Sequence, residues 1–216
     1  MSESKNQKVP GCKVVLLGES GVGKTSIILR YVSGTYNDGV TSTNGASYTS
    51  KNLQIPNTGK NILLDIWDTA GQEKYRSLTK YFYKDAAVAI LVYDIRKKDS
   101  FLNLKDFWYP QIKENCAKNM VIGLAGNKCD MFEEENVSEN EARQFADEIG
   151  AVFELTSAKN NTGINELFED VGNKYLDPNF QQKIKILQEQ DSEDGSRKIS
   201  LNSNDFKKKR DKKKFC

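Results

Sequence analysis

Four short polar stretches hold residues whose types and spacing suit the binding of a nucleotide with its metal. The first runs from Gly18 to Ser26 and fits the pattern G-x-x-x-x-G-K-[ST], the phosphate-binding P-loop. Its glycines let several backbone N–H groups turn toward phosphate oxygens, and a following helix adds the positive partial charge of its N-terminus. We expect Lys24 to reach the β- and γ-phosphates and the Thr25 hydroxyl to bind Mg²⁺. The alternative is an ordinary glycine-rich turn. The residues expected at the nucleotide here are Ser20, Gly21, Val22, Gly23, Lys24, Thr25 and Ser26.

The second stretch, 68–72, reads D-T-A-G-Q. An aspartate at a strand end, here Asp68, is suited to hold Mg²⁺. The N–H of Gly71 is placed to meet a γ-phosphate, and Gln72 to orient an attacking water. Alone this stretch could be a loop, but downstream of a P-loop it predicts nucleotide hydrolysis, with Gln72 and Lys24 as the catalytic side chains.

The third and fourth stretches predict the contacts to the base. Asn127 and Lys128 come just before Asp130 in the sequence N-K-C-D. The Asp130 carboxylate accepts from the ring N–H and the exocyclic amine of guanine, whereas adenine offers no such pair of donors. The stem of Lys128 is long enough to cover the base. The fourth stretch supplies backbone N–H groups for the base carbonyl, from Ser157, Ala158 and Lys159. Either stretch by itself could be a strand-end turn.

Alternating strands and helices are expected to position these stretches. Apolar runs predict buried strands at 12–17, 86–94, 120–125 and 151–155, and a turn at 56–59 predicts an antiparallel pair from 46–55 and 61–67. Four helices are expected, beginning at residue 26, at residue 101, after a Ser138–Glu141 capping box and at residue 164. The second of them should kink near Tyr109, because Pro110 follows. The fold class is α/β: a P-loop NTPase with a doubly wound, mostly parallel six-stranded sheet, one antiparallel edge strand and about five flanking helices. In such sheets ligands bind outside the carboxyl ends of the strands, so the stretches should converge.

Composition limits the other possibilities. We expect a disordered leader at 1–10, one domain at 11–176 and a flexible tail at 177–216. The longest apolar run is too short to span a bilayer, and 1–8 carries no apolar signal region. The four cysteines lack metal-ligand spacing and there is no histidine, which argues against a zinc site or a histidine-based triad. A reduced, cytosolic compartment is the default.

Charge is distributed unevenly. The chain has 32 basic and 30 acidic residues, yet 207–214 alone holds seven basic residues and one acidic residue, so the rest is mildly acidic. A basic tail next to Cys216 suits a membrane tether with one lipid chain. A nuclear or nucleic-acid-binding signal and a merely solvated end are the alternatives.

The order GESGVGKTS, WDTAGQE, NKCD and TSAK resembles the Ras-like small GTPases over 11–176. Within them the chain is similar to the Rab family, whose signatures lie at 44–48, 74–78, 81–86 and 92–95. The pattern at 42–48 is similar to the endosomal branch. Two positions depart from the family: Asn44 replaces an apolar residue, which puts effector packing in doubt, and a single terminal cysteine replaces the usual pair or the C-a-a-X motif.

The resemblance implies further roles. Thr43 matches the threonine that closes on Mg²⁺ and the γ-phosphate, and Tyr36 falls where an aromatic ring lies on guanine. Three aromatic residues match those that Rab proteins present to effectors, with ordinary packing as the alternative; they are Tyr48, Trp67 and Phe82. Cys216 matches a lipidation site.

The sequence therefore predicts a monomeric Rab-type switch that binds GTP and GDP with Mg²⁺, hydrolyses GTP slowly and recruits effectors in vesicle trafficking. No arginine lies in 35–44 to act in cis, so an activating protein should supply one, and an exchange factor should act as well. The expected location is the cytoplasmic face of an endomembrane, a vesicle or endosome, with no nucleic acid bound. The alternatives are a P-loop kinase for a nucleotide or small molecule, which would need clustered arginines, and a nucleotide-binding scaffold without turnover.

Overall fold

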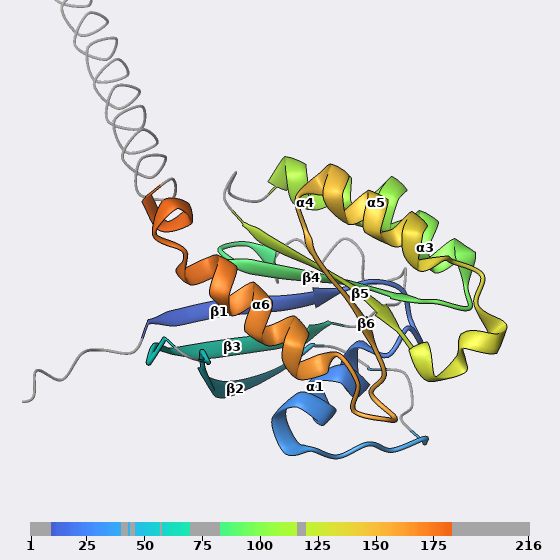
Figure 1. The fold of residues 1–216 in the computed structure, drawn as a ribbon, viewed down its shortest axis with the longest axis horizontal. Helices are drawn as coiled ribbons and strands as arrows, with labels where there is room; N and C mark the ends of the chain where they lie inside the picture. The colour runs from blue at the N-terminus through green and yellow to red at the C-terminus, as the bar shows by residue number, and fades with distance from the viewer. Residues whose placement is uncertain are drawn as a thin grey trace, which may run out of the picture. The chain divides into compact units, whose positions relative to one another are not determined.

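The computed structural model describes residues 10–39, 43, 46–56, 58–69, 83–115 and 120–182. It divides the chain into two compact units, Met1–Tyr175 and Leu176–Cys216. The first unit contains a six-stranded sheet in the order β2-β3-β1-β4-β5-β6 (Figure 1). The strands are β1 Gly11–Leu17, β2 Ala46–Gln54, β3 Asn61–Thr69, β4 Val88–Asp94, β5 Val121–Asn127 and β6 Val152–Thr156. β2 pairs antiparallel with β3, and all the other pairs are parallel, so the predicted fold class is confirmed.

Helices cover both faces of this sheet (Figure 1). The helices α1 (Lys24–Ser33) and α6 (Ile164–Leu176) share one face, where the rings of Tyr31 and Phe168 stack with centroids 3.7 Å apart. On the other face α3 (Lys98–Asn103), α4 (Tyr109–Asn115) and α5 (Glu139–Ile149) enclose a core around Phe101, Trp108 and Phe145. Residues of β4 are buried on both faces, which is why this strand reads as a continuous apolar run.

The helix ahead of Pro110 has a special geometry. Between α3 and α4 the chain forms a π-helical turn at Leu104–Trp108, and the N–H of Tyr109 donates to the carbonyl of Leu104, five residues earlier. Proline lacks an N–H and its ring crowds the carbonyl four residues before it, and a wide turn at this point relieves that crowding. The helix therefore changes its winding at the predicted place, while Tyr109 keeps right-handed helical angles.

The predicted capping box is only half formed. Ser138 caps α5, and its hydroxyl accepts from the N–H of Glu141 at 3.3 Å. The Glu141 carboxylate forms an ion pair with Lys98 of α3 instead of returning to Ser138. This pair connects two helices on the same face of the sheet. A short helix at Cys129–Glu134, labelled η3, links β5 to α5.

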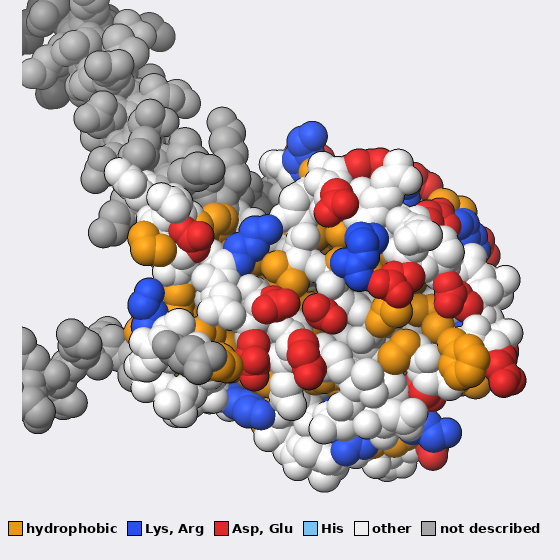
Figure 2. Space-filling model, in the orientation of Figure 1, with side chains coloured by type: hydrophobic (Ala, Val, Ile, Leu, Met, Phe, Trp, Pro, Cys, Tyr) orange, Lys and Arg blue, Asp and Glu red, His pale blue; other side chains and the backbone are white. Residues whose placement is uncertain are grey.

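The surface of the first unit carries an acidic region. In Figure 2 acidic side chains gather over α6, and Glu166 and Asp170 lie there close enough to Glu154 of β6 to affect its ionisation. Partial burial, with these two carboxylates, raises the pKa of Glu154.

In the second unit, residues 178–182 are helical, and the N–H of Asn179 donates to the Asp177 carboxylate at 2.7 Å. No helix in the described part of the chain is both long and apolar enough to cross a bilayer.

Candidate functional site

The loop between β1 and α1 contains two glycines at positions where any other residue would be strained and would clash with a neighbour. Gly18 has φ 147°, and a Cβ there would lie 2.2 Å from the carbonyl oxygen of Val92. Gly23 has φ 100°, and its Cβ would lie 2.2 Å from the side-chain nitrogen of Asn127. The first glycine lets the loop press against β4, and the second lets the N-K-C-D segment approach the loop.

The loop ends in a helix N-terminus without a cap. α1 begins after Gly23, which has no side chain to accept from the first N–H groups, and its first turn holds no acidic residue. Such a helix start presents unpaired N–H groups and a positive partial charge, which suits an anion.

Lys24 lies at this helix start and is almost completely buried, at 5% exposure. Its ammonium donates to the carbonyl oxygens of Gly18 and Glu19, each at 2.9 Å. Burial lowers the pKa of Lys24 to about 8, against the opposing effect of the Asp68 and Glu19 carboxylates. A buried cation that donates to neutral carbonyls favours an added anion.

Three oxygen-bearing side chains meet next to Lys24. The Thr25 hydroxyl donates to Asp68 Oδ2 at 2.7 Å, and it lies 2.7 Å from the hydroxyl of Thr43. Because Thr25 has only one proton to donate, Thr43 must be the donor in the second bond. Within the described residues the buried Oδ1 of Asp68 accepts no hydrogen bond, and burial raises the pKa of this carboxyl. Two hydroxyls and a carboxylate with an unpaired oxygen match the hard oxygen ligands that Mg²⁺ prefers.

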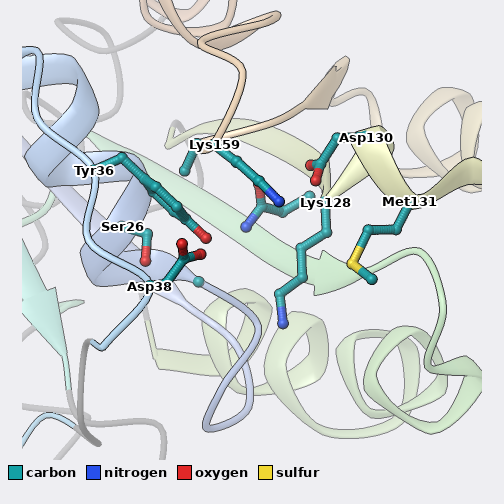
Figure 3. Close-up of a pocket in the computed structure, with 10 residues that line it drawn as sticks. Ser26, Tyr36, Asp38, Lys128, Asp130, Met131 and Lys159 are labelled. Carbon is teal, nitrogen blue, oxygen red and sulfur yellow. The ribbon is translucent and has the colours of Figure 1, made fainter.

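A cavity of about 240 Å³ opens at the other end of the loop (Figure 3). Tyr36 and Asp38 enter it from the segment after α1, and Lys128 and Asp130 from the segment after β5 (Figure 3). Burial and a hydrogen bond to Asp38 raise the pKa of Tyr36. The ten lining residues are Gly23, Ser26, Tyr36, Asp38, Asn127, Lys128, Asp130, Met131, Ala158 and Lys159.

Two side chains of the N-K-C-D segment are bound to the neighbouring stretches. Asn127 donates to the carbonyl of Val22 at 2.8 Å and accepts from Thr156 at 3.2 Å, so it joins the P-loop to the end of β6. Asp130 Oδ1 accepts from the Ser157 hydroxyl at 2.5 Å. The structure thus brings the first, third and fourth predicted stretches together around one cavity.

Sequence reasoning missed the residue that holds Lys128. The Lys128 ammonium lies 2.8 Å from Asp94 Oδ2 and donates to the carbonyl of Gly21 at 2.7 Å. Asp94 is fully buried and also accepts from Arg96, at 2.9 Å and 3.0 Å. Hydrogen bonds from Arg96 and Lys128 outweigh the effect of burial and lower the pKa of Asp94. The sequence did contain a signal for Asp94, because this acidic residue ends a predicted apolar strand. Asp68 was identified from its similar place at the end of a strand.

The candidate effector residues lie away from this cavity. Tyr48 of β2 and Trp67 of β3 are paired across the two strands with ring centroids 5.4 Å apart, and Tyr48 is 56% exposed. The Tyr48 hydroxyl donates to Asp65 at 2.7 Å, and the Lys13 ammonium lies 5.2 Å from the Trp67 ring centroid. The other predicted positions lie outside the described residues: Gly71, Gln72, Phe82 and Cys216, as well as Asn44.

Comparison with known proteins gives one consistent result. The model of the Ras family matches residues 13–177. The chain is 43% identical to human "Ras-related protein Rab-22A" over 162 residues, which are 75% of this chain and 82% of that protein. It is 43% identical to human "Ras-related protein Rab-31" over 77% of this chain and 85% of that protein. It is 42% identical to "Ras-related protein Rab-5A" of Dictyostelium discoideum over 79% and 84%.

Proposed function

Since the chain belongs to the Ras family, as a Rab-type small GTPase of membrane trafficking, we propose that the cavity and the adjoining P-loop are its guanine-nucleotide site. The observation that carries this proposal is the meeting of Asp130, Lys128 and the P-loop around one cavity. The kinase and the inactive scaffold predicted as alternatives have no observation in their favour.

The P-loop would bind the phosphates. Lys24, buried with a lowered pKa, exchanges its two carbonyl partners for phosphate oxygens, which stabilise its charge better than neutral carbonyls do. The unpaired N–H groups at the start of α1 act in the same direction. The proposed phosphate-binding residues are those predicted from the motif, from Ser20 to Ser26.

Thr25, Thr43 and Asp68 would hold Mg²⁺. The unpaired Oδ1 of Asp68 and the two hydroxyls fit this ion. When bound, Mg²⁺ neutralises phosphate charge. Thr43 lies in the segment between α1 and β2 and reaches Thr25 of α1 directly, so a ligand at this point affects both.

The base would lie in the cavity with its ring N–H and amine against Asp130. Tyr36 and the stem of Lys128 enter the cavity from different segments and are placed to cover the two faces of a flat ring. Asn127 acts mainly by joining the P-loop to β6. Backbone N–H groups of the segment Ser157, Ala158 and Lys159 would bind the keto oxygen.

Hydrolysis and signalling would depend on the loops around Thr43 and around Gly71 and Gln72. Gln72 orients the attacking water, and the γ-phosphate orders both loops until it is released. The exposed Tyr48 beside Trp67 supports an effector surface, to which Phe82 belongs by family resemblance.

The tail would attach the protein to a membrane. Its seven basic residues at 207–214 attract anionic lipids, and a lipid on Cys216 supplies the second signal that stable anchoring needs. We place the monomeric protein on the cytoplasmic face of an endosome or related vesicle, where an exchange factor and an activating protein act on it.

Single-turnover hydrolysis tests this function. The purified chain should hydrolyse bound GTP on the order of 10⁻⁴ per second, and Gln72→Leu should remove most of this activity while GTP affinity stays within about threefold. Gln144→Leu, at an exposed position of α5, is the matched control and should hydrolyse like the parent. A Gln72→Leu variant as active as the parent would remove Gln72 from its assigned role.

A further inference from the structure

One arginine outside the cavity connects two of the segments that line it. Arg30 lies in the last turn of α1 and is half-buried. Its guanidinium donates to the carbonyl of Ala158 at 2.7 Å and to the carbonyl of Lys159 at 3.0 Å. A third N–H donates to the carbonyl of Gly34 at 2.6 Å. The planar fork of arginine makes such a set of three bonds possible.

The segments that Arg30 connects both reach the cavity. Ala158 and Lys159 line it directly, and Gly34 precedes Tyr36, which lines it from the opposite segment. The guanidinium carbon lies 5.8 Å from the centroid of the Tyr36 ring, within the range of a cation–π contact. Arg30 is not a lining residue, so any effect it has on a ligand acts through these neighbours.

The segment held by Arg30 contains two unused donors. The N–H of Ser157 donates to Thr162, and the N–H of Asn160 donates to the Ser157 hydroxyl. In the part of the chain that the structure describes, no acceptor is found for the N–H of Ala158 or of Lys159. Ala158 is only 4% exposed. Lys159 is exposed, but an unpaired N–H at the buried Ala158 is costly, which points to an acceptor on a ligand.

The direction of both donors is set by the carbonyls beside them. In a planar trans peptide the C=O and the N–H point in opposite directions. The bond from Arg30 to the Ala158 carbonyl therefore orients the N–H of Lys159. The N–H of Thr162 donates to the Ser157 carbonyl at 3.1 Å and orients the N–H of Ala158 in the same way.

We propose that Arg30 is a positioning residue for recognition of the base keto oxygen, because it fixes the backbone that carries these two donors. This inference rests on the proposed binding of guanine nucleotide. A lysine at this position could not replace Arg30, since one ammonium on a flexible stem cannot hold all three carbonyls in a fixed plane.

The test compares the dissociation rates of three nucleotides from the full-length chain in reducing buffer. Guanosine and inosine diphosphate both carry the keto oxygen, whereas 6-thioguanosine diphosphate replaces only that oxygen with sulfur, a weaker acceptor. Arg30→Gln should accelerate the release of the first two about tenfold and of the thio compound about threefold or less. Arg30→Lys should show the same selectivity with a smaller acceleration. Arg143→Gln is the matched control, since Arg143 is exposed on α5, does not line the cavity, donates to Glu139 of its own helix and lies 5.1 Å from the centroid of the Phe153 ring.

Equal acceleration for all three nucleotides would mean that Arg30 merely supports the fold, and would overturn the inference. No acceleration in either variant would also overturn it. If the unaltered chain released guanosine diphosphate as fast as adenosine diphosphate, the proposed function itself would fail, which is seen before any variant is measured.

Discussion

The two ends of the candidate site are built differently. At the phosphate end, one continuous segment and Asp68 place a buried ammonium on neutral carbonyls and leave a buried carboxylate oxygen without a partner among the described residues. At the base end, segments far apart in the chain meet, and Asn127, Lys128 and Asp130 are each bound to other parts of the protein. The charged side chains of the phosphate end lack compensation that a ligand would supply, whereas those of the base end are held in place by protein partners.

From this difference we infer that the phosphate end mainly provides affinity for the nucleotide, and that the base end mainly provides selectivity for guanine. Charges that the fold leaves poorly compensated gain most from phosphate and metal. Groups that are held rigidly lose little freedom on binding and reject a base that cannot pair with them. Substitutions at either end test this difference.

The largest effect is expected at Lys24. Lys24→Ala removes a buried cation from the phosphates and should lower affinity for guanosine diphosphate about 100- to 1,000-fold, as measured by equilibrium titration. Lys128→Ala removes a cation that already pairs with Asp94, and should lower affinity about tenfold. A Lys128→Ala loss as large as that of Lys24→Ala would contradict the comparison.

A smaller effect is expected at Asp94. Asp94→Asn keeps the shape of the side chain but loses the charge that holds Lys128, so guanosine diphosphate should dissociate about tenfold faster. Arg96→Gln removes the other cation from the same carboxylate and should accelerate dissociation less than about threefold, because Lys128 keeps its partner. Stopped-flow release of a fluorescent nucleotide measures both rates, and equal rates for the two variants would show that Lys128 does not need Asp94.

The smallest effect is expected from pH. Burial lowers the pKa of Lys24 to about 8 in the ligand-free fold, and phosphates must raise it because they favour the charged form. A group whose pKa rises on binding gives its full affinity below the free pKa and loses it as pH increases. Affinity should therefore fall severalfold from pH 7 to just above pH 8, below the pH at which the base itself loses a proton. Lys24→Arg keeps its charge and should show a flat profile, even if its affinity is lower; a flat profile in the parent would contradict the assigned ionisation.

The sequence was most informative where a feature lies within one segment. The P-loop pattern, the antiparallel hairpin and the change of helix geometry before Pro110 depend on neighbouring residues, and each was predictable. The contacts of Arg30 and Asp94 join residues far apart in the chain, and neither residue belongs to the four stretches predicted to bind the nucleotide. The half-formed capping box has the same cause, because Lys98 of another helix competes for Glu141.

Selectivity for guanine over adenine is the property of the site that is most readily measured. The purified chain, stripped of nucleotide and supplied with Mg²⁺, is titrated with GTP and with ATP in parallel. GTP should bind at least about 10⁴-fold more tightly than ATP, because ATP would leave the buried polar groups of the base end unpaired. Equal affinity for the two nucleotides, or no binding of either, would contradict the proposed function.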